Sequence, residues 1–557
     1  FLRVSWNPPK QFFTTDEWAL ASVEEPISFL LFRAQAWTHQ YRDEFIQAMD
    51  QELYELHENK TFEFCYCPEG RRPIPCRWVF DIKRGEKNEI VRFKARLVIQ
   101  GFRQVEGVDF HKTFSSVAQM RTFRVICALA VHQNLRVTQY DISNAFLNAT
   151  LDQEIYMSLP PGYTTEGDKN RVWKLLKGLY GLKQASRLWN KLLIKSFKKA
   201  NLESCLTESG VLRIVGDTKS VCFVNLHVDD YCIATADEEL RKKIEDVMAK
   251  LFKVSYLGEL RLYLGIVCVW GTTSTGKRTL KLHQEPYHER LLVKMNYDKC
   301  GVKKTPAESN SKLSVTDGPR EGQDPVKWPY MSVTGSFMYS AMGTRPDLCQ
   351  RTNQCARFNK NPGDAHVNAQ KHLLRYLKHT KGRGIIYTAP DKPGQKIEIT
   401  AFCDSDWAGC PDTRRSTVGF VVMLSGGPVT WKSSLKKTLA LSSCEAEFMG
   451  LNDVAREVIW LCRFLEELGL EYHTPRIYCD SSSAICWAEE PVQHQRNKHV
   501  ELRYYYVRDL VGKQLIKVFK VNTLYNASDP LTKSGTQRMA EDLIPVLLGE
   551  KPPRLEE

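Results

Sequence analysis

The chain has no apolar run long enough to cross a membrane, no C-x-x-C pair and no periodic repeat. Its longest apolar runs, such as 125–131, fall far short of the roughly 20 residues that a membrane-spanning helix needs. The 17 cysteines are odd in number and irregularly spaced, and Cys65, Cys67 and Cys76 lack partners at structural-zinc spacing. These absences argue against a membrane protein, a disulfide framework and a zinc finger. They favour a reduced, intracellular chain whose cysteines pack in cores.

Positive charge predominates in the 557 residues, with 78 Lys and Arg against 65 Asp and Glu and a formal net charge of +13. The length predicts two to four domains. The charge favours a polyanionic partner, most often a nucleic acid, although a solubilising surface would have the same sign. The chain begins with Phe1 rather than Met, so we expect it to be part of a longer product.

Helical and strand-like patterns alternate along the chain. Helices are expected at 41–62, 119–134, 237–252 and 364–382, and the strand-like segments 76–84 and 91–102 flank a predicted turn. Two polar stretches, 314–328 and 389–396, are predicted to be linkers. Beyond 396, two strands precede a long helix at 442–469 and then strands and helices alternate, which is typical of an α/β domain.

Two adjacent acids, Asp229 and Asp230, interrupt the apolar run 221–235. A surface turn is the simpler interpretation of an acid pair. However, the flanking residues are apolar on both faces, so we expect the pair at the tip of a hairpin in a packed sheet. Asp141 ends another strand-like run and could lie beside the pair. Three such carboxylates repel one another unless a cation lies among them, and magnesium suits oxygen ligands and phosphoryl transfer.

A second ordered set of acids occupies the C-terminal part: Asp404, Glu445, Asp480 and Asp529. Each acid alone could be a surface carboxylate or a helix cap. As a set, they come from a strand, a helix, a second strand end and a late helix start. Such elements can converge on two metal ions that serve phosphodiester hydrolysis.

The chain resembles the reverse transcriptase of copia-type LTR retrotransposons from about residue 40 to its end. The motifs that carry the resemblance occur in order: "RFKARLVIQGF", "VDFHKTFSSVA", "QYDISNAFLN", "GLYGLKQAS", "HVDD", "LGELRLYLGI", "CDSDWAG", "ALSSCEAEF", "IYCDSSSAI", "NKHVELRYYYVRD" and "DPLTK". Two positions depart from the family pattern. His227 replaces the usual Tyr before Val-Asp-Asp, and Ser186 replaces the usual Pro after "LKQA".

The resemblance implies an α+β fold, namely a right-hand polymerase with fingers, palm and thumb/connection followed by an α/β ribonuclease H-like domain. The implied divisions are an N-terminal extension (1–40), fingers and palm (41–295), thumb/connection (296–395), the ribonuclease H-like domain (396–545) and a tail (546–557).

For the polymerase, the resemblance implies a metal triad of Asp141, Asp229 and Asp230 that holds two Mg²⁺ ions, with Mn²⁺ as an alternative. Phe146 would be an aromatic gate against a ribose 2′-hydroxyl, with core packing as the alternative. The remaining implied nucleotide contacts are Lys83, Arg84, Lys94, Arg96, Tyr180, Gly181 and Gln184. For each basic residue, a solvated hairpin is the alternative interpretation.

For the ribonuclease H part, the match implies catalytic acids at Asp404, Glu445, Asp480 and Asp529, with Asp406 and Glu447 as second choices. His499 would be a structural or substrate-contacting residue. Trp189 and Trp407 could stack on nucleic acid, but we expect both in the core.

The implied activity is DNA synthesis on RNA or DNA templates, with hydrolysis of the RNA strand of hybrids. The implied partners are an RNA template, a DNA primer, an RNA–DNA hybrid and deoxynucleoside triphosphates, with no membrane. A homodimer and an association with the integrase of the same polyprotein both stay open. The alternatives are an inactive element remnant or a domesticated nucleic-acid-binding protein, and an unrelated nuclease that uses only the second acid set.

Overall fold

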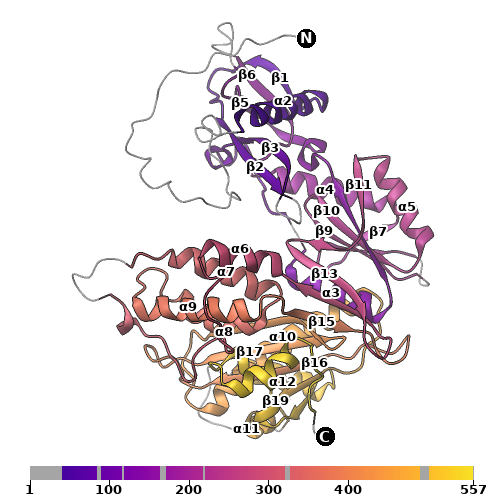
Figure 1. Ribbon diagram of the computed structural model, residues 1–557. Coiled ribbons are helices and arrows are strands. Elements are labelled where there is room, and N and C mark those ends of the chain that lie inside the picture. Colours follow the sequence, from indigo (N-terminus) through magenta and orange to yellow (C-terminus); the bar gives the residue numbers. More distant parts are fainter. Residues whose placement is uncertain are drawn as a thin grey trace.

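The computed structural model describes residues 41–84, 89–115, 118–163, 171–216, 220–319, 326–489 and 501–555. In its N-terminal part, helix α2 (Arg42–Glu58) packs on the hairpin of β2 (Cys76–Arg84) and β3 (Ile90–Ile99), as expected (Figure 1). The apolar face of α2 is buried, and the Phe45 ring lies 5.1 Å from that of Phe80. Beside the hairpin lies a sheet with the order β1 (Phe62–Tyr66), β6 (Arg171–Lys177), β5 (Thr150–Ser158).

A six-stranded sheet with the order β11-β4-β10-β9-β8-β7 follows. Its strands are β4 (Arg136–Ile142), β7 (Leu202–Ser204), β8 (Val211–Ile214), β9 (Cys222–His227), β10 (Asp230–Thr235) and β11 (Val254–Glu259). Both faces are covered: Tyr231 and Ile233 of β10 share a core with residues of α4 (Ala185–Lys198) and α5 (Glu238–Ala249). Cys232 and Ala234 of the same strand share a core with α3 (Met120–His132). Burial on both sides explains why the strands around the Asp229–Asp230 pair are apolar throughout.

The chain then forms a four-stranded sheet and a group of helices. The sheet has the order β12 (Leu262–Tyr263), β13 (Ile266–Thr272), β14 (Arg278–His283), β15 (Gly384–Thr388). The helices are α6 (Glu285–Lys294), α7 (Tyr330–Gly343), α8 (Cys349–Ala356) and α9 (Asp364–His379). Because β14 pairs with β15 and α6 packs on α9, residues from about 262 onward group in space with 326–388. The expected division at 295 therefore falls inside this group.

The C-terminal part is built on a five-stranded sheet with the order β18-β17-β16-β19-β20. The strands are β16 (Thr400–Asp406), β17 (Thr417–Leu424), β18 (Gly427–Leu435), β19 (Arg476–Cys479) and β20 (Lys517–Lys520). The three N-terminal strands are antiparallel neighbours, whereas β19 and β20 run parallel to β16. Its helices are α10 (Ser443–Glu467), α11 (Ser482–Glu489), α12 (Glu501–Gly512) and α13 (Ile544–Leu547), and a π-helix (Met539–Leu543) precedes α13.

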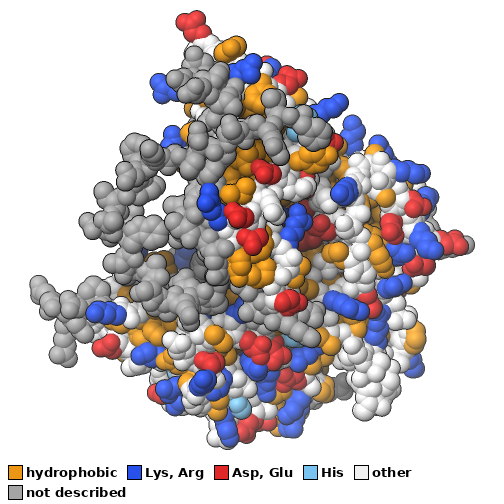
Figure 2. Space-filling model, turned by 45° about the horizontal axis from the view of Figure 1, so that its top comes forward, with side chains coloured by type: hydrophobic (Ala, Val, Ile, Leu, Met, Phe, Trp, Pro, Cys, Tyr) orange, Lys and Arg blue, Asp and Glu red, His pale blue; other side chains and the backbone are white. Residues whose placement is uncertain are grey.

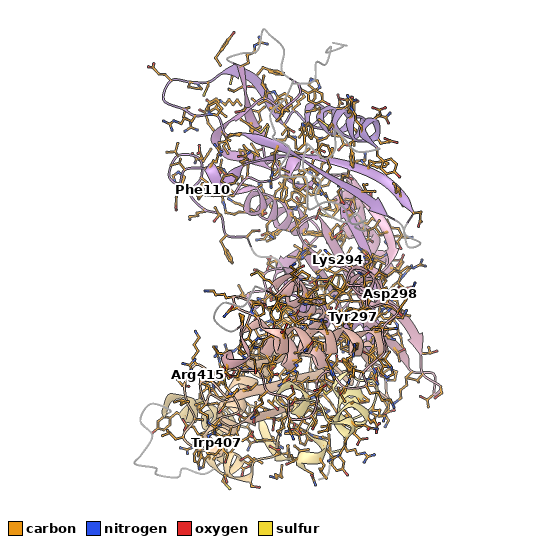
Figure 3. All side chains as sticks on the ribbon, turned by 60° about the vertical axis from the view of Figure 1, so that its left-hand side comes forward. Phe110, Lys294, Tyr297, Asp298, Trp407 and Arg415 are labelled. Carbon is orange, nitrogen blue, oxygen red and sulfur yellow. The ribbon has the colours of Figure 1, made fainter. Side chains whose placement is uncertain are left out.

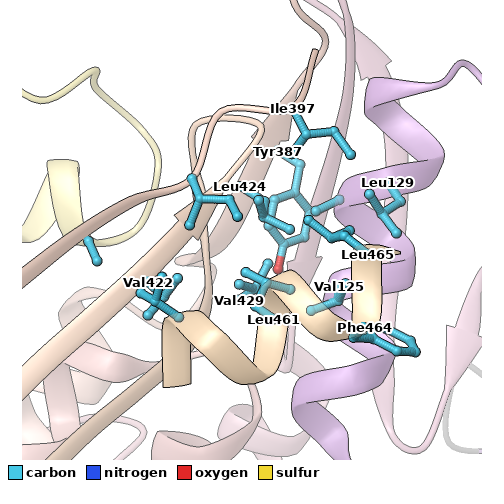
Figure 4. Close-up of a cluster of buried hydrophobic side chains, with 14 of the residues drawn as sticks. Val125, Leu129, Tyr387, Ile397, Val422, Leu424, Val429, Leu461, Phe464 and Leu465 are labelled. Carbon is cyan, nitrogen blue, oxygen red and sulfur yellow. The ribbon is translucent and has the colours of Figure 1, made fainter. Parts of the chain in front are cut away.

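Helix α3 joins the six-stranded sheet to the C-terminal part. It is buried from Thr122 to His132, and its residues Val125 and Leu129 lie among Leu461 and Phe464 of α10 and Tyr387 of β15 (Figure 4). The buried guanidinium of Arg124 donates to the carbonyl oxygens of Val429 (2.8 Å), Met342 (2.6 Å) and Gly343 (3.0 Å). One continuous core therefore spans the six-stranded sheet, the four-stranded sheet and the C-terminal part.

The first residues of the expected C-terminal tail are packed against the rest of the chain. Val546, Leu547 and Leu548 are buried, and the amide of Ile386 in β15 donates to the carbonyl oxygen of Leu548 at 2.9 Å. Residues 546–548, which we expected in a tail, therefore complete the core beside β15. No helix within the described ranges is apolar and long enough to span a bilayer.

The net positive charge is not concentrated on the face shown in Figure 2. Acidic and basic side chains are interspersed there among apolar ones. Any phosphate-binding surface must therefore be identified from particular residues rather than from the overall charge.

Candidate active sites

The first acidic site lies at the turn between β9 and β10. Asp230 pairs across the sheet with Asp141 of β4 and with His227 of β9. Asp229 lies in the turn, and its carbonyl oxygen accepts a hydrogen bond from the Ile142 amide at 3.0 Å. The three acids Asp141, Asp229 and Asp230 are thus brought together, as the sequence predicted.

The turn itself is strained and anchored. Val228 has φ +57, a left-handed conformation that a β-branched residue rarely adopts. The indole Nε1 of the buried Trp189 donates to the Val228 carbonyl oxygen at 2.6 Å. The prediction that Trp189 belongs to the core is confirmed, and its polar atom holds the peptide that precedes the acid pair.

Burial and mutual repulsion raise the pKa of two of these carboxyls, Asp230 and Asp141. Burial, Asp229 and Asp141 together raise the pKa of Asp230 to about 6. Burial and Asp229 also raise the pKa of Asp141, although the charge of Lys94 opposes that shift. Burial lowers the pKa of His227, whose buried Nδ1 has no hydrogen-bond partner among the described residues. An excess of oxygen ligands and negative charge fits a divalent cation.

A cleft of about 710 Å³ opens at this site. Asp141 and Asp229 line it together with the basic residues Arg92, Lys94 and Arg96 of β3. Helix α2 contributes Glu52 and Glu55 to its wall, and Glu55 accepts a hydrogen bond from the Asn144 amide group at 2.9 Å. The predicted basic residues Lys94 and Arg96 therefore face the acids across one cleft. The side chains of Lys83 and Arg84 lie outside the described part of the structure.

Two aromatic side chains and one basic side chain contact one another beside the cleft. The Phe146 ring meets the Tyr180 ring edge to face at 4.9 Å, and the Arg96 guanidinium lies 5.3 Å from the Tyr180 centroid. Tyr180 lines the cleft, whereas Phe146 is 9% exposed and packs behind it. Phe146 therefore has the core-packing role that the sequence left as its alternative, next to the site.

Gly181 and Gln184, expected to contact a nucleotide, have structural roles here. Gly181 has φ +96, and a Cβ at this position would lie 2.1 Å from the Ile99 carbonyl oxygen. Gln184 is fully buried; its Nε2 donates to the Asp109 carbonyl oxygen at 2.8 Å, and its Oε1 accepts from Gln104 at 3.0 Å. Both residues hold the loop after β6 against the loop after β3. The fully buried Gln184 presents no surface to a nucleotide, whereas Gly181 is exposed and the contact expected there stays a prediction.

The second acidic site lies at the ends of two parallel strands in the C-terminal sheet. Cys403 of β16 is in register with Cys479 of β19, so Asp404 and Asp480 follow at the same edge. Oxygen atoms of Asp404, Asp480 and Asp529 lie within 4.8 Å of one another, as do ligand atoms of Glu447, Cys479 and Asp480. Either group could hold a metal ion.

The helical acid at this site is Glu447 and not Glu445. The carboxylate of Glu445 accepts from the Leu441 amide at 2.7 Å, and Ser442 Oγ accepts from the Glu445 amide at 3.1 Å. These two hydrogen bonds cap the start of α10 and keep Glu445 out of the acidic group. Glu447, the second choice from the sequence, accepts from the Ser405 amide at 3.2 Å. The S-x-x-E pattern at 442–445 is the sequence signal that could have identified Glu445 as the capping residue and left Glu447 as the acid of this site.

Burial and neighbouring charges strongly perturb this site. Burial and Asp404 raise the pKa of Glu447 to about 10 and that of Asp529 to about 7, and they also raise the pKa of Asp480. Lys533, which the sequence analysis missed, lies 3.1 Å from Asp404 and 2.8 Å from Asp529. Its position in "DPLTK", four residues after Asp529, could have indicated it.

Further residues border the second site. Asp406, Asp529 and Lys533 line a cavity of about 370 Å³ together with Gln354 and Arg357. Trp407 is 48% exposed, and its Nε1 donates to the Ala440 carbonyl oxygen, so its expected place in the core is wrong. Trp407 and Arg415 lie on the same side of the molecule as Phe110 of the N-terminal part (Figure 3). His499 lies outside the described residues.

Comparison with known proteins assigns part of the chain to a family. Residues 59–309 match the family described as reverse transcriptase (RNA-dependent DNA polymerase). The retrovirus-related Pol polyprotein from transposon TNT 1-94 of Nicotiana tabacum is 37% identical over 499 residues, which are 89% of this chain and 37% of that protein. The corresponding polyprotein from transposon RE2 of Arabidopsis thaliana is 34% identical and covers 88% of this chain and 33% of that protein. The chain thus spans about a third of the length of these two relatives.

A shorter relative is covered completely. A putative transposon Ty5-1 protein of Saccharomyces cerevisiae is 30% identical over 319 residues, which are 57% of this chain and 100% of that protein. A solved structure of a foamy viral protease-reverse transcriptase in complex with double-stranded DNA has a TM-score of 0.45 and 11% identity, covering 86% of this chain and 69% of that chain. That score is below the level from which a shared fold follows.

Proposed function

Since the chain belongs to the reverse transcriptase family of copia-type transposon Pol polyproteins, we propose that it extends a DNA primer on an RNA or DNA template and cleaves the RNA strand of RNA–DNA hybrids. The observation that carries the first activity is the pairing of Asp230 with Asp141 and the position of Asp229 in the adjoining turn. The second activity is supported by the buried acids at the ends of β16 and β19.

The acids would hold the metal ions that both activities need. Asp141, Asp229 and Asp230 would hold Mg²⁺ or Mn²⁺ in the polymerase site, and Asp404, Glu447, Asp480 and Asp529 would do so in the nuclease site. When bound, such ions supply positive charge that lowers the pKa of an attacking hydroxyl or water and stabilises the leaving oxygen. The raised pKa values of Asp230 and Glu447 support this assignment, because burial and neighbouring acids both disfavour the charged carboxylates and a bound cation would offset that cost.

The chain's other residues would bind and orient the substrates. Arg92, Lys94 and Arg96 line the polymerase cleft opposite the acids and would contact the triphosphate or the template phosphates. Tyr180 would present its ring to the incoming nucleotide, while Phe146 holds that ring from behind. At the second site, Arg357 and the exposed Trp407 would contact the hybrid. Binding through these cations should weaken as the salt concentration rises.

Primer extension and hybrid cleavage with one protein preparation test the proposal. We would compare the unmodified chain with an Asp229→Asn/Asp230→Asn variant and with an Asp404→Asn variant in Mg²⁺. We expect the first variant to lose synthesis and retain cleavage, and the second to show the reverse. An unmodified chain that binds hybrid but makes no DNA with Mg²⁺ or Mn²⁺ would refute the synthetic activity and favour an inactive element remnant that binds nucleic acid.

A further inference from the structure

Lys533 lies inside the acidic group of the second site. Its Nζ is 3.1 Å from Asp404 Oδ1 and 2.8 Å from Asp529 Oδ1. The neighbouring Thr532 hydroxyl donates to the other Asp404 oxygen. Both oxygens of Asp404 and one of Asp529 are therefore satisfied by donors of the chain itself.

The opposite side of the same group has no such partner among the described residues. Within the described part of the chain, Glu447 Oε2 and Ser405 Oγ are buried and form no hydrogen bond. Ligand atoms of Glu447, Cys479 and Asp480 nevertheless lie within 4.8 Å of one another. A buried carboxylate oxygen without a partner is costly, so the ionised form of Glu447 is stabilised when a cation from outside the chain binds on this side.

We propose that Lys533 occupies one of the two cation positions of this site, so that without substrate the site binds a single divalent ion on the side of Glu447 and Asp480. The inference rests on the proposed metal-dependent nuclease function and deepens it. A second ion binds only after Lys533 leaves Asp404 and Asp529.

The charges explain why the Lys533 ammonium group and a second divalent ion exclude each other. When all four are ionised, Asp404, Glu447, Asp480 and Asp529 offer four negative charges. Lys533 and one divalent ion bring three positive charges, whereas Lys533 and two ions would bring five. Like charges a few ångströms apart in a buried site repel by several kcal/mol. A second ion close to the Asp404 and Asp529 oxygens would therefore meet the ammonium group directly.

Lys533 has space into which it can move. Its side chain is 38% exposed, and it lines the cavity of about 370 Å³ with Lys312, Gln354 and Arg357. A substrate phosphate in this cavity would attract the ammonium group away from the acids. The arrival of substrate would then open the second ion position, so that the complete metal site forms only with nucleic acid present.

Counting bound metal ions tests the inference without measuring activity. Mn²⁺ binding by electron paramagnetic resonance would be measured on the full chain carrying Asp229→Asn/Asp230→Asn, which removes two acids of the polymerase site. We expect one tight Mn²⁺ per chain in this background. With Lys533→Met added to this background, a second Mn²⁺ ion should bind. Its affinity should be at least tenfold higher than that of any second Mn²⁺ ion bound by the parent.

Two variants control for charge and for position. Lys533→Arg keeps the positive charge and should retain one ion. Lys312→Met removes a lysine from the same cavity that forms no ion pair with Asp404 or Asp529 in the described part of the chain, and it should not change the count. Thermal melting of each variant in EDTA would verify folding.

The outcomes separate the inference from the proposed function. If the parent binds one ion and Lys533→Met binds the same number with the same affinity, Lys533 is not a substitute for an ion and the inference fails alone. If the parent binds no Mn²⁺ at the second site, the proposed nuclease site fails and the inference fails with it.

Discussion

Two glutamates that lie two positions apart in α10 have opposite roles. Glu445 caps the helix, and its carboxylate accepts from the Leu441 amide. Glu447 turns into the acidic group, where burial and Asp404 raise its pKa to about 10. Residues two apart on a helix point in different directions, so only one of them can reach Asp404.

Replacing each glutamate should separate catalysis from stability. Glu447→Gln should reduce hybrid cleavage at least about 100-fold. Loss of a residue that only supports a metal ligand typically reduces activity about 10–100-fold, and loss of a ligand itself should reduce it more. The same variant should melt at a higher temperature in EDTA near neutral pH, since Gln removes the cost of keeping a buried carboxyl whose pKa is raised far above its value in the unfolded chain. Glu445→Ala should retain cleavage and lose about 1 kcal/mol of stability with the cap of the helix start. The reverse pattern of cleavage would restore Glu445 as the catalytic acid.

Stability should depend on pH through Asp230. Its pKa is raised from 3.8 to about 6, so the folded chain binds this proton more tightly than the unfolded chain. The contribution of this carboxyl to stability is therefore fully present below about pH 4 and is lost as the pH rises through 6. Asp230→Asn should stabilise the metal-free chain at pH 8 by about 1–2 kcal/mol, allowing for solvent screening.

Melting temperatures in EDTA at pH 4 and pH 8 measure this effect. The gain from Asp230→Asn should shrink toward zero at the lower pH. Asp237→Asn is a control whose effect on stability should have the opposite sign, so that this variant is less stable than the parent at pH 8. Asp237 accepts from the Leu240 amide at 2.9 Å, and its pKa is lowered by that bond and by Ser220. An Asp230→Asn variant whose advantage is equal at both pH values would contradict the assignment.

At the level of single elements, the β9–β10 hairpin depends on one side chain from outside it. The turn presents Asp229 and Asp230 on strands buried on both faces, and the left-handed Val228 lies directly before them. Trp189 of α4 holds the Val228 carbonyl, and its ring packs edge to face against Phe252 at 5.2 Å. The position of the acid pair is therefore fixed by a helix rather than by the hairpin alone.

Trp189→Phe should reduce DNA synthesis about tenfold while hybrid cleavage stays unchanged. The ring packing is kept, so the stability loss should be near the 1 kcal/mol of one hydrogen bond, whereas a looser turn misplaces the acids. Trp270→Phe is the matched control, since Trp270 Nε1 also donates to a carbonyl oxygen, that of Leu260, at 3.1 Å. Equal losses of synthesis in the two variants would show that the effect is a general loss of stability.

At the scale of the whole molecule, α3 joins the six-stranded sheet and the C-terminal part into one folding unit. Its buried residues share a core with β10 on one side and with α10 and β15 on the other. Arg124 adds hydrogen bonds to three further segments. Cooperative unfolding follows from a core that neither part can complete alone.

Calorimetry of two core variants tests whether the molecule unfolds as a single cooperative unit. Leu461→Ala in α10 should cost about 2–5 kcal/mol and shift the main unfolding transition. Leu193→Ala in α4 lies in the other core of the six-stranded sheet and should shift the same transition. Two separate transitions, each moved by only one of the variants, would contradict a single unit.

The sequence predicted the grouping of the acids better than the connections between elements. Asp141, Asp229 and Asp230 were correctly brought together, because apolar strands that end in acids leave few arrangements. The order of elements after residue 396 was predicted only in part, since two strands were expected before the long helix and the structure has a third, β18. Gln184 was misplaced because a glutamine that satisfies two buried loops is indistinguishable in sequence from one that contacts a ligand.

The shared core was the least predictable feature. Helix α3 is apolar on nearly every side, which indicates burial but does not identify its partners. Those partners, such as Leu461 and Tyr387, lie more than 250 positions along the chain, and no local pattern specifies them. The packed residues 546–548 were taken for a tail for the same reason.

The burial of α3 in both parts has a consequence for the products of the proposed reactions. If the two sites belong to one rigid body, the number of base pairs between the growing DNA end and the cut in the RNA is set by geometry. RNA fragments made during synthesis should then end at a constant distance behind the primer terminus, whatever the template sequence. The lengths of those fragments would report the distance between the sites in solution.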